Sequence, residues 1–215
     1  TGVSVVLTRG EDRAILTAPG TIAALRRDLV QPDLVRTARH VHVASYFLQL
    51  DLRGELLELF RDAHGAGVTT SIDPNWDPTE GWDGGLLPLL EHTDLFFPNA
   101  AEARAITGIE EASVAAQALA ERGPVVAMKF GRDGGLVVAG TEAVRCRSVP
   151  IDAKDTTGAG DSFDAGFLAG RLEGWDLDRC LALAVACGAL STRALGGTGG
   201  QPTMEEALAA MEVVP

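Results

Sequence analysis

The strongest chemical signal in this sequence is the run Asp-Thr-Thr-Gly-Ala-Gly-Asp-Ser-Phe at residues 155–163. Gly158 and Gly160 stand just before a predicted helix, and Asp161 falls in its first turn. The amides that open a helix have no partner within it, and the helix dipole adds partial positive charge there. Such a loop suits an anion, and a carboxylate beside it can take a proton from an attacking hydroxyl. This combination favours phosphoryl transfer.

We predict Asp161 as the catalytic base, and the backbone amides of Gly158, Ala159 and Gly160 as donors to the phosphoryl oxygens. Phosphoryl transfer leaves a protein mainly positioning and electrostatic work, which suits such a cluster of amides. A plainer interpretation is a glycine-rich helix entry without a ligand, in which Asp161 only complements the helix dipole, worth about 0.3–1 kcal/mol. Within this run we favour the catalytic role.

Two weaker motifs follow other predicted strands. Asn99 and Glu102 lie three residues apart at the start of a helix, hence on one face, and a capping box explains them equally well. Gly131 and Gly134 allow close approach of a nucleotide to the backbone, or form a plain turn. Lys129 adds charge near the phosphates, or extends from a strand end toward solvent.

The remaining polar candidates carry less weight. The sequence Asp-Pro-Asn at 73–75 follows a strand, and it either lines the site or forms a β-turn. None of the histidines shows ligand spacing, and His40 and His42 face one side of a strand, so we expect packing roles for them. Gly166 and Gly170 lie inside a helix, where glycine costs about 1 kcal/mol against alanine, so we expect close packing there.

The run at 155–163 resembles the second signature of the PfkB, or ribokinase-like, family of carbohydrate kinases. The resemblance extends to Asn-Ala-Ala-Glu at 99–102, similar to the family's Asn-x-x-Glu motif. It also includes residues 129–134, similar to its nucleotide-contacting Gly-x-x-Gly turn. Order and spacing agree along the whole chain. The resemblance implies a three-layer αβα fold with a mostly parallel central sheet.

The resemblance also implies roles for the site residues. Asp161 is the base, while Asn99 and Glu102 orient Mg²⁺ through waters and contact the phosphates. Asp155 and the carbonyl of Thr157 belong to a monovalent-cation site for K⁺. Its far side would be formed by carbonyls around Ser191, Ala194 and Gly196.

Several features leave parts of this assignment open. Asp155 bonded to local amides is as good an explanation as the cation site. The residues Thr-Gly-Gly at 198–200 are extra relative to the family pattern, which puts the far side of the cation site in doubt. Val185 stands where many relatives carry a polar residue near the adenine, so the base specificity is open.

The implied function is ATP-dependent phosphorylation of a hydroxyl on a sugar or sugar-like molecule, with ATP, Mg²⁺ and K⁺ as cofactors. One alternative is a nucleoside kinase of the same family. Another is a non-catalytic sugar- or nucleotide-binding relative, against which the intact Asp161 argues. A Walker-type ATPase does not fit, because the sequence Gly-x-x-x-x-Gly-Lys-Ser/Thr is absent.

Composition limits the classes of protein. With 215 residues, 46% hydrophobic and 22% charged, the chain suits one globular domain. A net charge of −12 without a basic run argues against nucleic-acid binding. We expect no membrane partner, because no apolar stretch approaches ~20 residues. The odd count of cysteines at 146, 180 and 187 fits a reduced, cytoplasmic protein.

Apolar periodicity and turn residues predict the elements that position these motifs. Strand and helix alternate from residue 40 to 130, which is typical of a parallel sheet with helices on its faces. Ligands in such sheets bind outside the carboxyl ends of the strands. We predict strands at 3–8, 13–18, 40–45, 68–72, 94–97, 125–128, 134–139 and 143–149, and helices at 21–30, 52–66, 86–90, 100–107, 114–121, 160–173, 177–193 and 203–212.

The resemblance further implies that the chain lacks the N-terminal third of a complete kinase. Residues 1–18 would be the remnant of a small β lid, and residues 19–215 the C-terminal two-thirds of the kinase domain. Lid strands can join subunits in relatives, so the full-length protein would form a homodimer through them. We expect the 215-residue chain alone to phosphorylate a sugar weakly or not at all.

Overall fold

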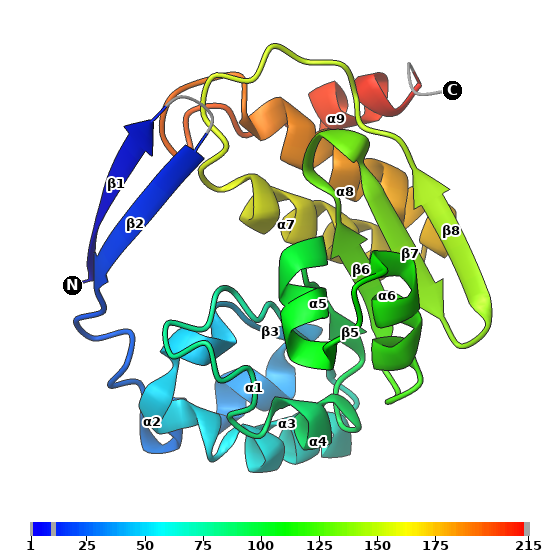
Figure 1. The fold of residues 1–215 in the computed structure, drawn as a ribbon. Helices are drawn as coiled ribbons and strands as arrows, with labels where there is room; N and C mark the ends of the chain where they lie inside the picture. The colour runs from blue at the N-terminus through cyan, green and yellow to red at the C-terminus, as the bar shows by residue number, and fades with distance from the viewer. Residues whose placement is uncertain (1, 10–11, 213–215) are drawn as a thin grey trace.

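A computed structural model describes residues 2–9 and 12–212 of the chain (Figure 1). The middle of the predicted turn at 9–12 lies outside the described residues. The strands are β1 (Val3–Arg9), β2 (Asp12–Ala18), β3 (His40–Val43), β4 (Thr69–Ile72), β5 (Leu95–Phe96), β6 (Val125–Lys129), β7 (Gly135–Ala139) and β8 (Glu142–Cys146). The α-helices are α1 (Pro32–Thr37), α2 (Leu50–Arg53), α3 (Leu56–Gly65), α4 (Leu86–Leu90), α5 (Ala100–Thr107), α6 (Ala112–Ala120), α7 (Ala159–Leu172), α8 (Leu177–Ser191) and α9 (Met204–Met211).

The central sheet has six strands in the order β3-β4-β5-β6-β7-β8. Strands β3 to β6 run parallel, with a helix between each strand and the next, and β7 and β8 complete an antiparallel meander. The predicted parallel sheet and meander are therefore confirmed. The parallel arrangement brings the carboxyl ends of β4, β5 and β6 to one edge, where the residues that follow them meet.

Helices cover both faces of this sheet, because successive residues of its central strands are apolar and point to opposite sides. Phe96, Val126 and Met128 pack into one core with α3, α4, α5 and α6. Phe97 and Ala127 pack into a second core with α7 and α8. The three-layer αβα architecture is thus confirmed, and Figure 1 shows α7 and α8 on one side of the sheet with α5 and α6 on the other.

The strands β1 and β2 form a separate antiparallel hairpin that stands beside the main body (Figure 1). Val5 lies opposite Leu16 in its register, so the two side chains share a face. Both are more than half exposed, as are Val3 and Leu7. One face of the hairpin therefore presents apolar side chains to solvent.

The prediction of a helix over residues 21–30 is wrong. Only a short 3₁₀ turn at Arg27–Leu29 forms there. Leu25 and Val30 each pack against the core from this irregular segment, and their spacing does not fall on one face of a helix. The predicted cap Thr21 closes only a turn, in which its carbonyl accepts the N–H of Ala24.

The predicted helix over 52–66 is broken into α2 and α3. The chain interrupts the helical hydrogen bonding at Gly54, where glycine carries a cost of about 1 kcal/mol within a helix. Helix α1 was not predicted, although Pro32 at its first position is a known helix start. The other predicted strands and helices are confirmed, with small shifts of their ends.

Helices α7 and α8 pack unusually closely, as the glycines inside α7 led us to expect. A Cβ at Gly166 would lie 2.9 Å from the carbonyl oxygen of Leu183 and 3.0 Å from the Cα of Ala184. A Cβ at Gly170 would lie 2.9 Å from Sγ of Cys180. The two glycines let the helices approach at backbone distance, which holds α7 against α8.

We expect Gly166→Ala to lower the free energy of unfolding by about 1–3 kcal/mol, because the added methyl group overlaps the backbone of α8. The matched control is Gly65→Ala at the end of α3, where a Cβ meets no atom within 4 Å. That change should be neutral or stabilise by up to about 1 kcal/mol. Urea unfolding of both variants checks this, and a Gly166→Ala variant as stable as the parent would contradict it.

Candidate active site

The run at 155–163 forms a tight entry into α7. Gly158 is the residue before the helix and has φ of 76°, a left-handed conformation that favours glycine. A Cβ at this position would lie 2.6 Å from the carbonyl oxygen of Gly197. Asp161 lies in the first turn of the helix, with its side chain exposed. The predicted amides and the predicted base are therefore placed together at an accessible helix start.

A cavity of about 720 Å³ opens beside this helix start. Its volume lies in the range of small-molecule sites in proteins. Ala159 and Gly160 form one part of its wall, next to Lys129. A mostly apolar part of the wall comes from the segment after β8 and from α7 and α8, with Val149, Pro150, Ile151, Phe163, Val185 and Ala189.

The predicted Gly-x-x-Gly turn also lines this cavity. Gly131 and Gly134 join β6 to β7, and both have positive φ. A Cβ at Gly134 would lie 2.0 Å from the carbonyl oxygen of Cys146 on the neighbouring strand. Phe130 donates its backbone N–H to the carbonyl of Gly134, which closes the turn. The glycines thus serve the turn and the cavity wall together.

Asn99 and Glu102 form the capping box that the sequence left as an alternative. The Asn99 side chain accepts the backbone N–H of Ala101 and of Glu102 at 2.8 and 2.9 Å. Oε2 of Glu102 accepts the N–H of Asn99 at 2.8 Å. Burial and the negative charge of Asp73 raise the pKa of Glu102 to about 7. Glu102 is therefore a buried carboxyl group that changes charge near neutral pH.

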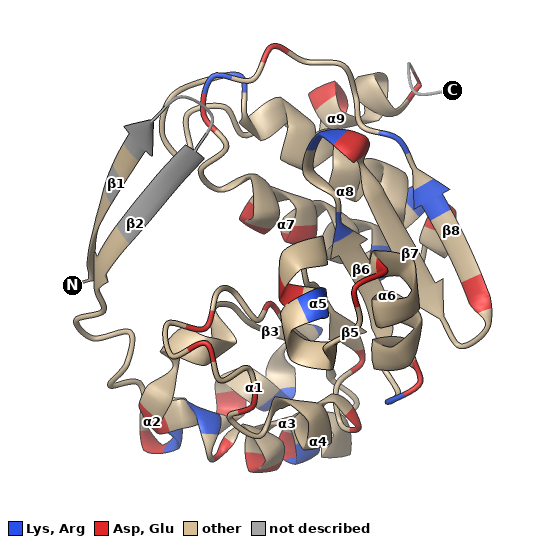
Figure 2. Ribbon diagram, viewed as in Figure 1, with Lys and Arg blue, Asp and Glu red and all other residues tan. Residues whose placement is uncertain are grey.

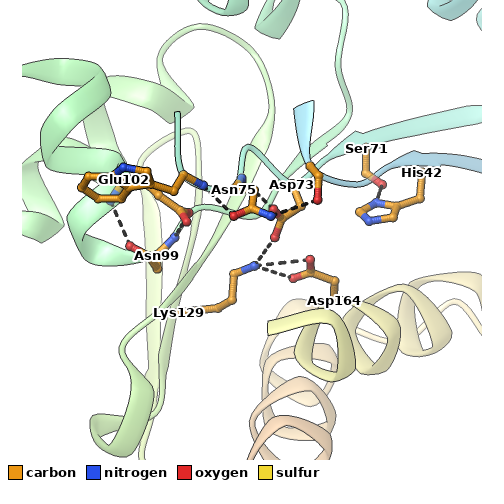
Figure 3. Close-up of polar contacts among 10 residues, drawn as sticks. His42, Ser71, Asp73, Asn75, Asn99, Glu102, Lys129 and Asp164 are labelled. Carbon is orange, nitrogen blue, oxygen red and sulfur yellow. Dashed lines mark hydrogen bonds and ion pairs between the residues drawn. The ribbon is translucent and has the colours of Figure 1, made fainter. Parts of the chain in front are cut away.

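Lys129 lies between two carboxylates at the edge of the sheet (Figure 3). Its Nζ donates to Oδ2 of Asp73 at 2.5 Å and to Oδ1 of Asp164 at 3.0 Å. Asp73 follows β4, Lys129 ends β6, and Asp164 lies one turn after Asp161 on α7. Figure 2 shows acidic residues at the beginning of α7 and a basic residue at the end of β6. The ion pairs join three elements beside the helix start.

Burial sets the electrostatics of this ion-pair cluster. By itself it would lower the pKa of Lys129, but the charges of Asp164 and Asp73 outweigh it, so that pKa is raised. Burial raises the pKa of Asp164 well above its usual range despite Lys129. Asp73 differs, because Lys129 overcomes the effect of burial and lowers its pKa. Asp73 and Lys129 are therefore the two groups of the cluster whose charged forms are favoured.

Sequence reasoning left Asp73 ambiguous and missed Asp164. Residues 73–75 do more than form a turn, because Asp73 pairs with Lys129 while its Oδ1 accepts the N–H of Asn75. Asp164 lies three residues after Asp161, so the two acids share a face of α7. That spacing was the one signal in the sequence for a second acid at this site.

The carboxylate of Asp155 accepts the N–H of Thr157 and the N–H of Gly196, both at 2.9 Å. These are the local amide bonds that the sequence offered as an alternative to a cation site. They join the entry of α7 to the loop after α8. Asp155 and Thr157 thus belong to the structure of the helix entry, whatever else they bind.

His42 lies next to the ion-pair cluster, close enough for the charges of Asp73, Lys129 and Asp161 to act on its ring (Figure 3). His40 and His42 both hydrogen-bond Oγ of Ser71 at 2.7 Å. A second cavity of about 460 Å³ at the amino ends of the parallel strands is lined by His40, His64 and His92. No group of three or more His, Cys, Asp or Glu side chains suited to a metal ion occurs within residues 2–9 and 12–212. In the same part of the chain, no helix is long and apolar enough to span a bilayer.

With this geometry established, comparison with known proteins defines the class. Residues 1–204 match the family model described as pfkB family carbohydrate kinase. The chain belongs to this family, and its three motifs occupy the site just described.

Individual relatives agree with this. The chain is 31% identical over 175 residues to an uncharacterized sugar kinase of Archaeoglobus fulgidus, covering 79% of this chain and 67% of that protein. It is 33% identical to an ATP-dependent ribose-1-phosphate kinase of Halopiger xanaduensis, covering 89% and 61%. Its fold is similar to the crystal structure of adenosine kinase from Sinorhizobium meliloti, with a TM-score of 0.86, 27% identity and coverage of 99% and 66%. The chain spans about two-thirds of the length of these proteins or slightly less.

The raised pKa of Glu102 predicts a pH dependence of stability. Between the usual value of 4.5 and about 7, the folded state binds more protons at this group than the unfolded state does. Glu102 therefore destabilises the fold increasingly as the pH rises through this window, by about 3 kcal/mol at most.

We expect Glu102→Gln, whose amide oxygen still accepts the Asn99 N–H, to remove this effect. The free energy of unfolding of the variant, measured in EDTA, should gain on the parent from pH 5 to pH 8. Parallel pH profiles of the two proteins would contradict the raised pKa.

Proposed function

We propose that this chain carries the catalytic site of an ATP-dependent kinase that phosphorylates a hydroxyl group of a sugar or sugar-like molecule. The observation that carries the proposal is the exposed carboxylate of Asp161 in the first turn of α7. The preceding residues, Ala159 and Gly160, line a cavity of about 720 Å³, large enough for a nucleotide. Membership of the carbohydrate kinase family supports it.

The chemistry assigned to these residues is a single displacement. The acceptor hydroxyl oxygen forms a bond to the γ-phosphorus of ATP, and the bond from that phosphorus to the bridging oxygen breaks. The bonding electrons leave with ADP, and the hydroxyl proton passes to Asp161. The amides at residues 158–160 stabilise the charge on the equatorial oxygens, which is the main task left to the protein.

The shape of the cavity suggests how the nucleotide lies. We place the phosphates at the helix start near Gly160 and Lys129, because the amides and the ammonium group attract anions. The base then lies against the apolar wall, in contact with Phe163 and Val185. Few polar groups face this wall, so we expect weak discrimination among purine bases.

The donor set near Glu102 fits Mg²⁺. The charges of Asp73 and Lys129 balance each other, and Glu102 adds a second carboxylate when it ionises near neutral pH; Mg²⁺ favours one or two carboxylates with retained waters. In this proposal Glu102 and Asn99 hold the ion, which when bound neutralises charge on the nucleotide phosphates. The assignment of K⁺ to Asp155 and Thr157 stays a prediction.

The acceptor is proposed from the family. A sugar is supported by the similarity to sugar and ribose-1-phosphate kinases. A nucleoside is the second candidate, supported by the fold similarity to an adenosine kinase at 27% identity. A binding protein without activity remains the rival class, and the accessible Asp161 argues against it.

We propose the hairpin of β1 and β2 as part of a lid, residues 1–18 in our division of the chain, with residues 19–215 as the kinase body. The apolar side chains of Val3, Val5, Leu7 and Leu16 support a surface that is covered in the working protein. A second copy of the hairpin is the partner that we predict for it, giving a homodimer.

We expect Asp161→Asn to lower kcat by about 10²–10⁴-fold, with KM for ATP changed only a few-fold, because the variant keeps the shape and loses the base. ADP release in the presence of a panel of sugars and nucleosides measures this. The assay uses the protein as it is expressed from its gene.

The matched control is Asp178→Asn, an exposed acid in the first turn of α8. Both changes remove the same helix-dipole interaction, worth about 0.3–1 kcal/mol, so both should alter stability similarly. Only Asp161→Asn should lower kcat by the factor given above. Equal activity of the two variants would reduce Asp161 to a helix-stabilising residue and remove the basis of the proposal.

A further inference from the structure

The ion-pair cluster of Asp73, Lys129 and Asp164 is unusually well buried for charged side chains. The side chains of Lys129 and Asp73 are each 13% exposed, and that of Asp164 is 3% exposed. Burying a salt bridge costs desolvation that the attraction between its partners often fails to recover. Apolar residues of similar size would hold three elements together as well. We therefore expect the cluster to serve a purpose other than stabilising the fold.

Lys129 has a donor left over after its ion pairs. An ammonium group carries three N–H bonds at tetrahedral angles. Asp73 takes one of them through Oδ2. The two oxygens of Asp164 lie at 3.0 and 3.3 Å from Nζ and subtend a much smaller angle than two N–H bonds do, so one hydrogen serves both. The hydrogen bonds of Nζ within the described residues go to these two carboxylates, and they leave the third N–H unused.

The position of Nζ indicates where this third N–H is useful. A Cβ at Gly160 would lie 3.6 Å from Nζ, so the ammonium group lies close to the first turn of α7. Lys129 and Gly160 line the same cavity. Lysine places a compact, strongly charged donor at such a point, and this chain has only two lysines among its 18 basic residues.

We propose that Lys129 donates its third N–H to the γ-phosphoryl group of the bound nucleotide, and that Asp73 and Asp164 are positioning residues that hold the ammonium in that direction. This inference rests on the proposed function and deepens it. It assigns Lys129 to the group that is transferred, whereas the helix amides serve any phosphate at the site. The site should therefore distinguish a nucleoside triphosphate from a diphosphate through Lys129.

The test is calorimetric binding of ADP and of the non-hydrolysable β,γ-imido analogue of ATP, each with Mg²⁺, to the chain. Lys129→Met should weaken binding of the analogue at least about tenfold more than binding of ADP, since a hydrogen bond to a charged group is lost. The control is Lys154→Met, which removes the other lysine from the exposed loop before Asp155. It should leave the ratio of the two affinities unchanged.

Two substitutions of Asp164 test the positioning role, also in case Lys129→Met fails to fold. Asp164→Asn keeps an oxygen acceptor for Nζ, and it should retain the preference for the analogue. Asp164→Leu removes the acceptor but leaves a neutral pair of Lys129 with Asp73, so no uncompensated charge remains buried. The preference should fall severalfold in Asp164→Leu alone.

The outcomes separate the inference from the function on which it rests. A parent protein that binds neither nucleotide contradicts the proposed kinase site itself. A parent that binds both, with equal losses for the two nucleotides in Lys129→Met, overturns only the role of Lys129. Equal affinity ratios in Asp164→Asn and Asp164→Leu overturn the positioning role of Asp164.

Discussion

The close approach of the entry of α7 to the loop after α8 is the constraint on which this site depends. Gly158 and Gly197 meet at a distance that excludes any side chain at Gly158, and Asp155 ties the same two segments together through backbone amides. Behind them, Gly166 and Gly170 let α7 lie directly on α8. The first amides of α7 therefore occupy a fixed position against the sheet edge, and preorganised donors of this kind are what phosphoryl transfer requires.

Charge is distributed around that fixed point in a definite way. Acidic groups exceed basic ones, with Asp73, Asp164 and Glu102 around a single Lys129 (Figure 3). Burial favours the neutral, protonated form of two of these acids, because it raises the pKa of Asp164 and of Glu102. In the proposed function, this excess of acidic groups favours a nucleotide that arrives with Mg²⁺ over a free phosphate anion. Asp161 stands outside the cluster, with its side chain exposed to solvent.

Much of this was predictable from the sequence, and the failures have physical causes. The helix start at 158–161 and the glycine turn at 131–134 are local, so composition and spacing identified them. The cluster of Asp73, Lys129 and Asp164 joins residues far apart in the chain, and only the fold reveals it. The helix predicted from Thr21 as a cap failed over residues 21–30, because Thr21 closes only a turn and side chains such as Leu25 pack on the core from irregular backbone. The apolar periodicity of residues 52–66 ran through Gly54, where the helix breaks.

The most direct test of the central claim is to follow the backbone amide signals of Ala159 and Gly160 by ¹H–¹⁵N NMR during titration with nucleotides. If these amides hold the phosphates, Mg²⁺ with the β,γ-imido analogue of ATP should shift both signals strongly. Adenosine, which lacks phosphates, should shift signals of the apolar wall near Val185 and leave those two nearly unchanged. Unshifted Ala159 and Gly160 signals at saturation with the analogue would contradict the account.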